Sequence, residues 1–274
     1  MLWSRGFSLG IEAAGFEVAL AVDIDATTCQ AYQQNFPHTR VLSADLRQLT
    51  GIEIKKSLKE HFASRKLPLK DAGIDLVFGS PPCQGFSIKG KRDPADPRNE
   101  LVGHFVRLVL ELAPPVFVME NVSGLSDERY APLLEPIKNQ IETAGYTLQE
   151  WELNAADYGV PQRRKRVFWV GVASGRVQIS PPAPQNSLVT VKEALADLPD
   201  VRDYPHLSIS DRIVLSIAAY NKQQELASDY VRRLQELFPQ VGETQVGDRL
   251  PSDQALIRSS RTFQKDFSWV SGAN

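Results

Sequence analysis

Cys83 and Glu120 are the residues of this sequence whose types and positions point most directly to catalysis. Pro81 and Pro82 stiffen the backbone after a predicted buried strand, so the Cys83 thiol is expected to project into a crevice at the sheet edge. Glu120 ends another apolar run and is expected at the same edge. A thiolate that adds to C6 of a pyrimidine makes C5 enamine-like, provided that an acid meets the ring nitrogen N3. The two residues therefore suit attack on a pyrimidine, although a cysteine taken alone is more often a buried structural thiol.

Two pairs of charged residues extend this candidate site. Arg164 and Arg166 precede an apolar run, and they could orient a base carbonyl and offset developing charge. Asp23 ends a predicted strand, where a carboxylate commonly binds a ribose hydroxyl, and Asp45 could accept from an adenine amine. A sulfonium methyl donor bound near the aspartates would complete the chemistry. The plainer alternatives are a solvated basic loop and aspartates that cap turns or helices.

The fold must bring these residues to one edge of a sheet. Short runs rich in Val, Ile and Phe alternate with helical patterns, which is typical of an α/β fold with a doubly wound, mostly parallel sheet. Gly15 and Gly145 follow the first and last predicted helices, where a left-handed residue ends a helix. Strands are predicted over residues 18–23, 75–79, 116–120, 147–153 and 167–172, and helices over residues 8–14, 26–35, 99–112 and 132–144.

The sequence pattern changes beyond about residue 174. A Pro-Pro-Ala-Pro stretch suits an extended linker, and a helix is predicted over residues 190–198 because Thr190 and Glu193 have the spacing of a capping box. The remainder is polar and helix-prone. We therefore predict a cofactor-binding and catalytic domain over residues 1–178, and a linker with a short helical appendage over residues 179–274.

The composition limits the class of protein. The chain has 274 residues, 42% of them apolar, with a net charge of -2, which suits one large or two small globular domains. No apolar run reaches the roughly 18 residues of a bilayer span and no secretory signal is visible, so a cytoplasmic location is expected. Two cysteines and 4 scattered histidines predict no metal site. The total charge does not indicate a nucleic-acid binder, but Lys89, Lys91, Arg92 and residues 163–166 are locally basic.

Three short motifs, in this order, resemble those of the cytosine-5 DNA methyltransferases. They are Pro-Cys-Gln at residues 82–84, Glu-Asn-Val at residues 120–122 and Gln-x-Arg-x-Arg at residues 162–166. The resemblance covers about residues 5–200. It implies a Rossmann-like fold that uses S-adenosyl-L-methionine, and methyl transfer to C5 of a cytosine flipped out of double-stranded DNA. For a bacterial or archaeal member it also implies association with the nucleoid and a place in restriction and modification.

The resemblance also implies roles for individual residues. Cys83 resembles the nucleophile that forms the covalent adduct with C6, Glu120 the residue that meets N3, and Arg164 and Arg166 the pair that orients the base. Phe7, Asp23, Ile24, Asp45, Leu46 and Pro81 lie in the segments that contact the cofactor. Gln84, Ser87, Lys89, Lys91, Arg92 and Arg98 belong to a catalytic loop that contacts DNA.

Both ends of the sequence depart from the family pattern. Only Gly6 matches the glycine-rich turn, where Trp3 and Arg5 would place bulky side chains against the cofactor, and the strand before this turn is missing. The closing motifs and a complete target-recognition region are not found. We therefore expect a truncated chain that is marginally stable or associates, with a second polypeptide as a candidate supplier of recognition. The alternatives are an inactive fragment, a DNA-binding pseudoenzyme and, more weakly, a tRNA cytosine-5 methyltransferase.

Overall fold

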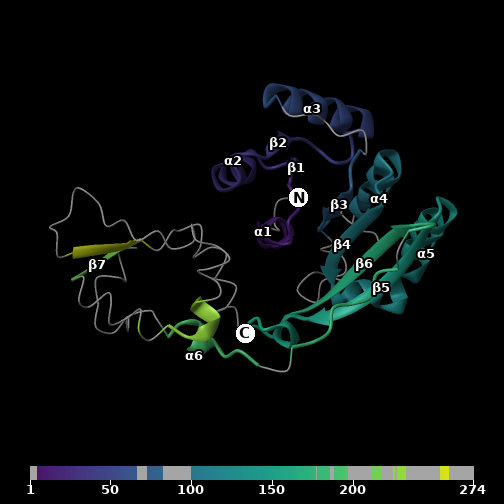
Figure 1. Ribbon diagram of the computed structural model, residues 1–274. Helices are drawn as coiled ribbons and strands as arrows, with labels where there is room; N and C mark the ends of the chain where they lie inside the picture. Colours follow the sequence, from purple (N-terminus) through teal and green to yellow (C-terminus); the bar gives the residue numbers. More distant parts are fainter. Residues whose placement is uncertain are drawn as a thin grey trace. The chain divides into compact units, whose positions relative to one another are not determined.

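The computed structural model divides the chain into two compact units (Figure 1). The first unit comprises Met1–Asn154 and Lys165–Ala183, and the second comprises Ala155–Arg164 and Pro184–Asn274. Within the described ranges, no helix has the length and apolar content needed to cross a membrane. The structure describes residues 5–66, 73–82, 100–176, 178–185, 188–196, 212–216, 225, 227–232 and 254–258.

A parallel pair of strands, β1 and β2, opens the first unit. Leu20 lies opposite Arg40 at the start of this pair, and helix α2 makes the crossover between the strands. The Asp25 carboxylate caps α2 by accepting a hydrogen bond from the Thr28 amide at 2.6 Å. The elements of this part are α1 (Arg5–Ala13), β1 (Leu20–Asp23), α2 (Ala26–Asn35), β2 (Arg40–Ser43) and α3 (Gly51–Ser64).

A second sheet of the first unit has the strand order β3-β4-β6-β5. β3 and β4 are parallel, whereas β6 runs antiparallel to both of its neighbours, β4 and β5. Helix α4 makes the crossover from β3 to β4, and α5 leads from β4 to β5. The elements are β3 (Leu76–Gly79), α4 (Glu100–Leu112), β4 (Val116–Val122), η4 (Ser123–Ser126), η5 (Glu128–Tyr130), α5 (Ala131–Thr143), β5 (Tyr146–Asn154) and β6 (Lys165–Ala173).

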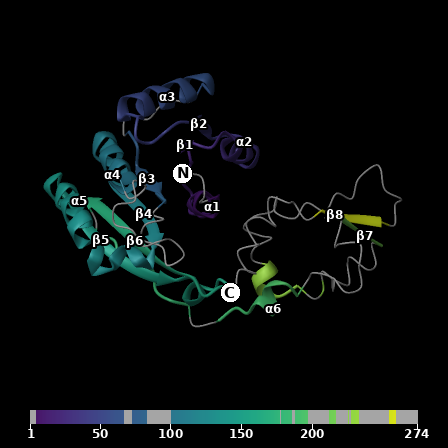
Figure 2. The ribbon, with the colours of Figure 1, turned by 180° about the vertical axis from the view of Figure 1, so that it is seen from behind.

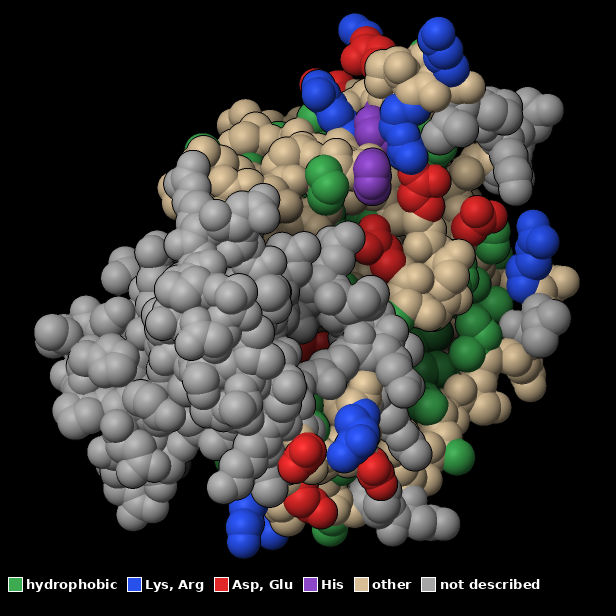
Figure 3. Space-filling view, turned by 60° about the vertical axis from the view of Figure 1, so that its left-hand side comes forward, with side chains coloured by type: hydrophobic (Ala, Val, Ile, Leu, Met, Phe, Trp, Pro, Cys, Tyr) green, Lys and Arg blue, Asp and Glu red, His purple; other side chains and the backbone are tan. Residues whose placement is uncertain are grey.

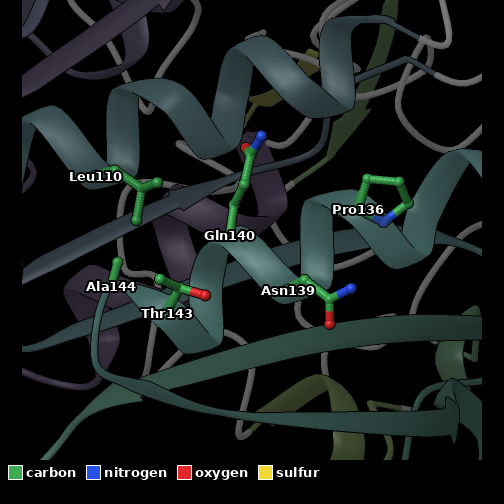
Figure 4. A pocket seen from close by; sticks show the side chains of 6 residues that line it. All are labelled: Leu110, Pro136, Asn139, Gln140, Thr143 and Ala144. Carbon is green, nitrogen blue, oxygen red and sulfur yellow. The ribbon is translucent and has the colours of Figure 1, made fainter.

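The main core lies between this sheet and helices α4 and α5, which run beside it in Figures 1 and 2. Phe117, Met119 and Trp169 are completely buried there. α4 contributes its apolar face, because Val102, Phe105, Val106 and Val109 recur at helical spacing. A shallow pocket between α4 and α5 includes none of the predicted site residues (Figure 4). It is lined by Leu110, Pro136, Asn139, Gln140, Thr143 and Ala144.

The observed elements confirm the predicted α/β class and add two elements that the sequence pattern did not reveal. Strand β2 has only four residues, none of them buried, so it carries no strong apolar signal. Helix α3 was also missed, although Thr50 and Glu53 form a capping box at its start. The antiparallel placement of β5 and β6 follows from their connection, since no helix long enough for a parallel crossover separates them.

The second unit differs from its predicted form. Helix α6 (Val191–Ala194) begins after Thr190, and the capping box of Thr190 and Glu193 confirms the predicted start. The expectation of a helical appendage is wrong for β7 (Arg212–Ser216) and β8 (Gln254–Arg258), which form an antiparallel pair. The segment between β5 and β6 also belongs to this unit, and it contains η6 (Ala155–Tyr158).

Candidate active site

The carboxylate of Glu120 is the best-defined polar group of the candidate site. Ser80, just after β3, donates a hydrogen bond from Oγ to Glu120 Oε2 at 2.5 Å. Arg166, on β6, places Nε 2.9 Å from Glu120 Oε1. The Glu120 and Arg166 side chains are only 17% and 22% exposed, so their ion pair is largely shielded from water. Charged groups held by two elements in this way have a defined orientation.

The sheet register explains why these three residues meet. Gly79 lies opposite Met119 in the parallel pair, so Ser80 follows at the level of Glu120. Arg166 lies opposite Val122 in the antiparallel pair, and Val122 shares a face with Glu120 because side chains alternate along a strand. Three strands thus bring one hydroxyl, one carboxylate and one guanidinium to the same place.

Asn121 fixes the backbone that leads to Cys83. It is buried, its Nδ2 donates to the Pro81 carbonyl at 3.2 Å, and its Oδ1 accepts from the Val122 amide at 2.8 Å. Gly79 allows the same segment to approach α4, because a Cβ at this position would lie 2.7 Å from the Phe105 ring. The backbone preceding Cys83 is therefore held by β4 on one side and by α4 on the other.

The predicted nucleophile and the predicted DNA contacts lie outside the described residues. The gap spans residues 83–99. Their roles therefore stay predictions from the sequence. The residues concerned are Cys83, Gln84, Ser87, Lys89, Lys91, Arg92 and Arg98.

Two predicted cofactor residues lie at the end of β1. Asp23 is buried, at 6% exposure, and its Oδ1 accepts from the Asp25 amide at 2.9 Å. Ile24 follows it and is 65% exposed. A buried carboxylate at the end of a strand, next to an exposed apolar side chain, suits a ligand that has both hydroxyl groups and a flat apolar ring.

Asp45 lies after β2 and pairs with Arg47. Arg47 Nη2 approaches Asp45 Oδ2 at 2.6 Å, and the Arg47 amide donates to Asp45 Oδ1 at 3.0 Å. The hydrogen bonds from the Arg47 side chain and amide hold the pKa of Asp45 below its usual range. Asp45 therefore presents an ionised acceptor of the kind that an adenine amine requires, and both of its oxygens accept from Arg47 in this structure.

The other predicted cofactor residues contribute mainly to packing. Phe7, on α1, packs edge-on against Phe78 of β3 with ring centroids 4.8 Å apart. Leu46 packs against the core of the first unit, and Pro81 is buried at the end of β3. Phe7 packs on the strand that leads to Ser80, Leu46 directly follows Asp45 in the sequence, and Pro81 directly follows Ser80.

Arg164 and Arg166 are separated by the division of the chain. Arg166 belongs to the first unit, where it pairs with Glu120, whereas Arg164 belongs to the second. The Arg164 carbonyl accepts from the Ala155 amide at 2.9 Å and closes the segment between β5 and β6. The joint role of the two arginines stays a prediction.

Sequence reasoning passed over Ser80, Arg107 and Glu111 as site residues. Ser80 stands inside the motif that was used, but its hydroxyl matters only because the parallel register brings it to Glu120. Arg107 and Glu111 form an i, i+4 ion pair at 2.6 Å on a helix that is otherwise apolar in this stretch. An Arg and a Glu four residues apart within an apolar run were the sequence signal that could have pointed to this pair.

Charge of both signs is spread over the described surface. In Figure 3, Lys and Arg side chains lie next to Asp and Glu side chains on the face shown. Exposed ion pairs of the described residues include Arg129 with Asp127 at 2.5 Å and Lys165 with Glu152 at 3.0 Å. On the described part of this face, mixed charge gives no strong field of one sign.

Comparison with known proteins gives a consistent family match. The family of C-5 cytosine-specific DNA methylases matches residues 4–263. The Type II methyltransferase M.XorII of Xanthomonas oryzae pv. oryzae is 38% identical over 229 residues, which cover 83% of this chain and 51% of that protein. M.AquIA of a Picosynechococcus species is 42% identical over 180 residues, covering 62% and 69%.

A solved structure agrees with the sequence matches. It comes from E. coli and is described as a DNA modification methyltransferase encoded within a prophage. The match has a TM-score of 0.60 at 37% identity and covers 71% of this chain and 52% of that one. The chain therefore spans about half the length of most of the relatives named here.

Proposed function

Because the chain belongs to the C-5 cytosine-specific DNA methylase family, we propose that it supplies the catalytic and cofactor-binding part of a DNA (cytosine-5-)-methyltransferase. One observation carries the proposal, namely that Ser80 and Arg166 hold the Glu120 carboxyl group at the ends of three strands. A fixed acid at this position is what the ring nitrogen of a cytosine needs while its C6 is attacked.

The proposed reaction begins at C6 of a cytosine that has left the base stack. The Cys83 thiolate forms an S–C6 bond, and Glu120 gives a proton to N3, so C5 becomes nucleophilic. S-adenosylmethionine supplies the methyl group and leaves as S-adenosylhomocysteine. N3 then returns its proton to Glu120, and loss of the C5 proton to a base restores the C5–C6 double bond and expels the Cys83 thiolate. Arg166 offsets charge at the base carbonyl, with Arg164 as its proposed partner.

The acceptors at the ends of β1 and β2 fit this methyl donor chemically. Asp23 and Asp45 offer carboxylate oxygens to ribose hydroxyls and to an adenine amine, and Ile24 offers an exposed apolar surface to the purine ring. Phe7, Leu46 and Pro81 are proposed to complete the site. These residues would hold the donor and orient its methyl group toward C5.

Target choice is proposed to depend on polypeptide outside this sequence. The chain spans about half the length of M.XorII, which leaves room in such relatives for parts that are not represented here. A second polypeptide or a longer form of the same chain would supply base recognition. Lys89, Lys91, Arg92 and Arg98 are proposed to hold DNA phosphates. Because the relatives named above are bacterial and the proposed substrate is double-stranded DNA, the proposed place of action is the cytoplasm, at the nucleoid.

Covalent trapping tests the proposal directly. The full chain is incubated with S-adenosylmethionine and duplex DNA in which 5-fluorocytosine replaces cytosine, so that the C5 substituent cannot leave as a proton. A complex that survives denaturation is expected for the wild type. Cys83→Ser should lose the complex, whereas Cys29→Ser should keep it, because the buried Cys29 thiol donates to the Asp23 and Leu42 carbonyls, to which a serine hydroxyl can also donate.

Other outcomes separate the alternatives. Duplex DNA binding without a trapped complex would identify a DNA-binding pseudoenzyme. No binding and no complex would identify a chain that is inactive by itself, either as a fragment or because it requires the second polypeptide. A complex with 5-fluorocytosine tRNA but not with duplex DNA would replace the DNA substrate by RNA. A complex that persists in Cys83→Ser would remove Cys83 from its proposed role.

A further inference from the structure

Two charged residues of α4 hold the turn that carries Asp45. Arg107 Nη2 donates to the Leu46 carbonyl at 2.9 Å and to the Leu49 carbonyl at 2.8 Å. Its Nη1 pairs with Glu111 Oε1 at 2.6 Å. Glu111 Oε2 in turn accepts from the Gly51 amide at 2.5 Å. The Arg107–Glu111 pair thus satisfies two carbonyls within the turn that connects β2 to α3 and the first amide of α3.

The turn itself is built around Asp45. The Asp45 carbonyl accepts from the amides of Gln48 and Leu49, each at 3.0 Å. Its carbonyls at Leu46 and Leu49 are the two that Arg107 binds. The guanidinium therefore contacts the turn immediately after Asp45, and movement of this contact would move the Asp45 carboxylate.

Close packing at Gly51 provides independent evidence that the approach of α4 to the turn is built into the fold. A Cβ at Gly51 would lie 2.8 Å from Glu111 Cβ and 3.2 Å from Glu111 Oε2. Only glycine permits this approach without displacement of α4. Lys55 adds a further contact, since its Nζ donates to the Glu111 carbonyl at 2.9 Å.

The same helix also contacts the catalytic strand end. The Phe105 ring of α4 packs on Gly79, immediately before Ser80. Phe105 and Arg107 are two positions apart, so one helix carries both contacts. Figures 1 and 2 show α4 next to both α3 and β3. The turn with Asp45 and the strand end before Cys83 are therefore positioned from one rigid element.

We propose that Arg107 and Glu111 are positioning residues for the adenine end of S-adenosylmethionine, which they control through the turn at Asp45. This inference rests on the proposed function. Arg107 does not touch the cofactor. It fixes where Asp45 presents its acceptor relative to Glu120, and so where the methyl group lies relative to C5.

The test measures the dissociation constant of S-adenosylmethionine for the full chain by calorimetry. Arg107→Met removes every donor but keeps an unbranched apolar stem, and it should raise the dissociation constant about tenfold or more. Arg107→Lys keeps a positively charged donor group without the planar guanidinium, and it should have an intermediate effect. Arg129→Met is the matched control, because Arg129 pairs with Asp127 away from the turn, and it should leave the constant unchanged.

A double variant separates positioning from general stability. If Arg107 acts through Asp45, the loss caused by Arg107→Met should largely disappear in an Asp45→Ala background. Hydrogen exchange gives a second readout: the Gln48 and Leu49 amides should exchange faster in Arg107→Met, whereas those of β4 and β6 should not change.

Several results would overturn the inference. Wild-type affinity in Arg107→Met would remove the positioning role while leaving the proposed function intact. Additive losses in the double variant would assign Arg107 to general stability. If the wild-type chain itself binds no S-adenosylmethionine, the proposed function fails for this chain and the positioning role falls with it.

Discussion

The two sheets of the first unit differ in how firmly they hold their functional groups. The four-stranded sheet carries Glu120 and completely buries Phe117, Met119 and Trp169 against α4 and α5. The two-stranded sheet carries Asp23, and its own core is limited to a small cluster around Tyr32. A two-stranded sheet alone is marginal in water, so it depends on the elements around it.

This contrast shows which contacts join the two parts of the site. A third cluster connects them, since Leu49 and Leu58 pack there with Leu108 and Leu112 of α4. The Arg107–Glu111 pair adds directed hydrogen bonds to this apolar contact. Apolar packing sets the separation of the two parts, and the hydrogen bonds set the orientation of the turn. The part of the site that carries Glu120 is positioned by its own four-stranded sheet. The part that carries Asp23 and Asp45 is positioned largely through α4.

The largest expected effect on methyl transfer is that of a substitution at Glu120, which the four-stranded sheet holds firmly. Glu120→Gln removes the acid but retains groups that can bond to Ser80 and Arg166. Methyl transfer in a single-turnover assay should fall by about 10²- to 10⁴-fold. Glu152→Gln is the matched control, because Glu152 forms an exposed pair with Lys165 on the same sheet. Retention of activity within about tenfold by Glu120→Gln would show that the strand ends hold Glu120 for another purpose.

The part of the site that carries Glu120 was easier to predict from the sequence than the part that carries Asp45. Glu120 and Arg166 stand in long apolar strands whose pattern is strong, and the structure pairs them at 2.9 Å. Strand β2 and helix α3 were missed, so the turn with Asp45 could not be placed. The role of Ser80 depends on strand register and that of Arg107 on a contact 61 residues away along the chain. Neither relation is encoded in local periodicity.

Core truncation should distinguish the two sheets by stability. Trp169 is completely buried, donates to Glu150 Oε2 at 3.0 Å and lies 5.5 Å from Lys138 Nζ. Trp169→Ala should therefore lower the free energy of unfolding by about 3–5 kcal/mol in urea titrations. Phe36→Ala in the smaller cluster should instead raise hydrogen exchange mainly in β1, β2 and α2. Equal exchange changes in β4 would mean that both sheets unfold together.

Removal of the Ser80 hydroxyl should have a smaller effect on the reaction. Ser80→Ala leaves Glu120 with Arg166 but without the hydrogen bond to Oε2. The rate of methyl transfer should fall by about tenfold, which corresponds to one lost hydrogen bond to a charged group, with the KM for S-adenosylmethionine unchanged. Ser80→Thr restores a hydroxyl and should recover part of the rate. A rise in the KM for S-adenosylmethionine without a fall in the rate of methyl transfer would instead assign Ser80 to cofactor binding.

The smallest expected effect compares one buried tyrosine in each part. Tyr32 donates to Ser8 Oγ at 2.8 Å and Tyr146 donates to the Pro114 carbonyl at 2.7 Å. Tyr32→Phe and Tyr146→Phe should each cost about 1 kcal/mol of unfolding free energy at pH 8, measured by urea titration. Burial raises the pKa of both phenols, and that of Tyr32 to about 12.

The pH dependence of this cost separates the two tyrosines. A folded pKa above the unfolded value of about 10 means that the stabilisation is complete below pH 10 and declines as the pH rises toward 12. The advantage of the wild type over Tyr32→Phe should therefore shrink between pH 10 and about pH 12, because the phenylalanine variant lacks this titration. Tyr146→Phe should show the same sign of change, because burial also raises the pKa of Tyr146. A constant difference for Tyr32→Phe over this range would mean that water reaches the phenol, and that the two-stranded sheet opens more readily than its packing around Tyr32 indicates.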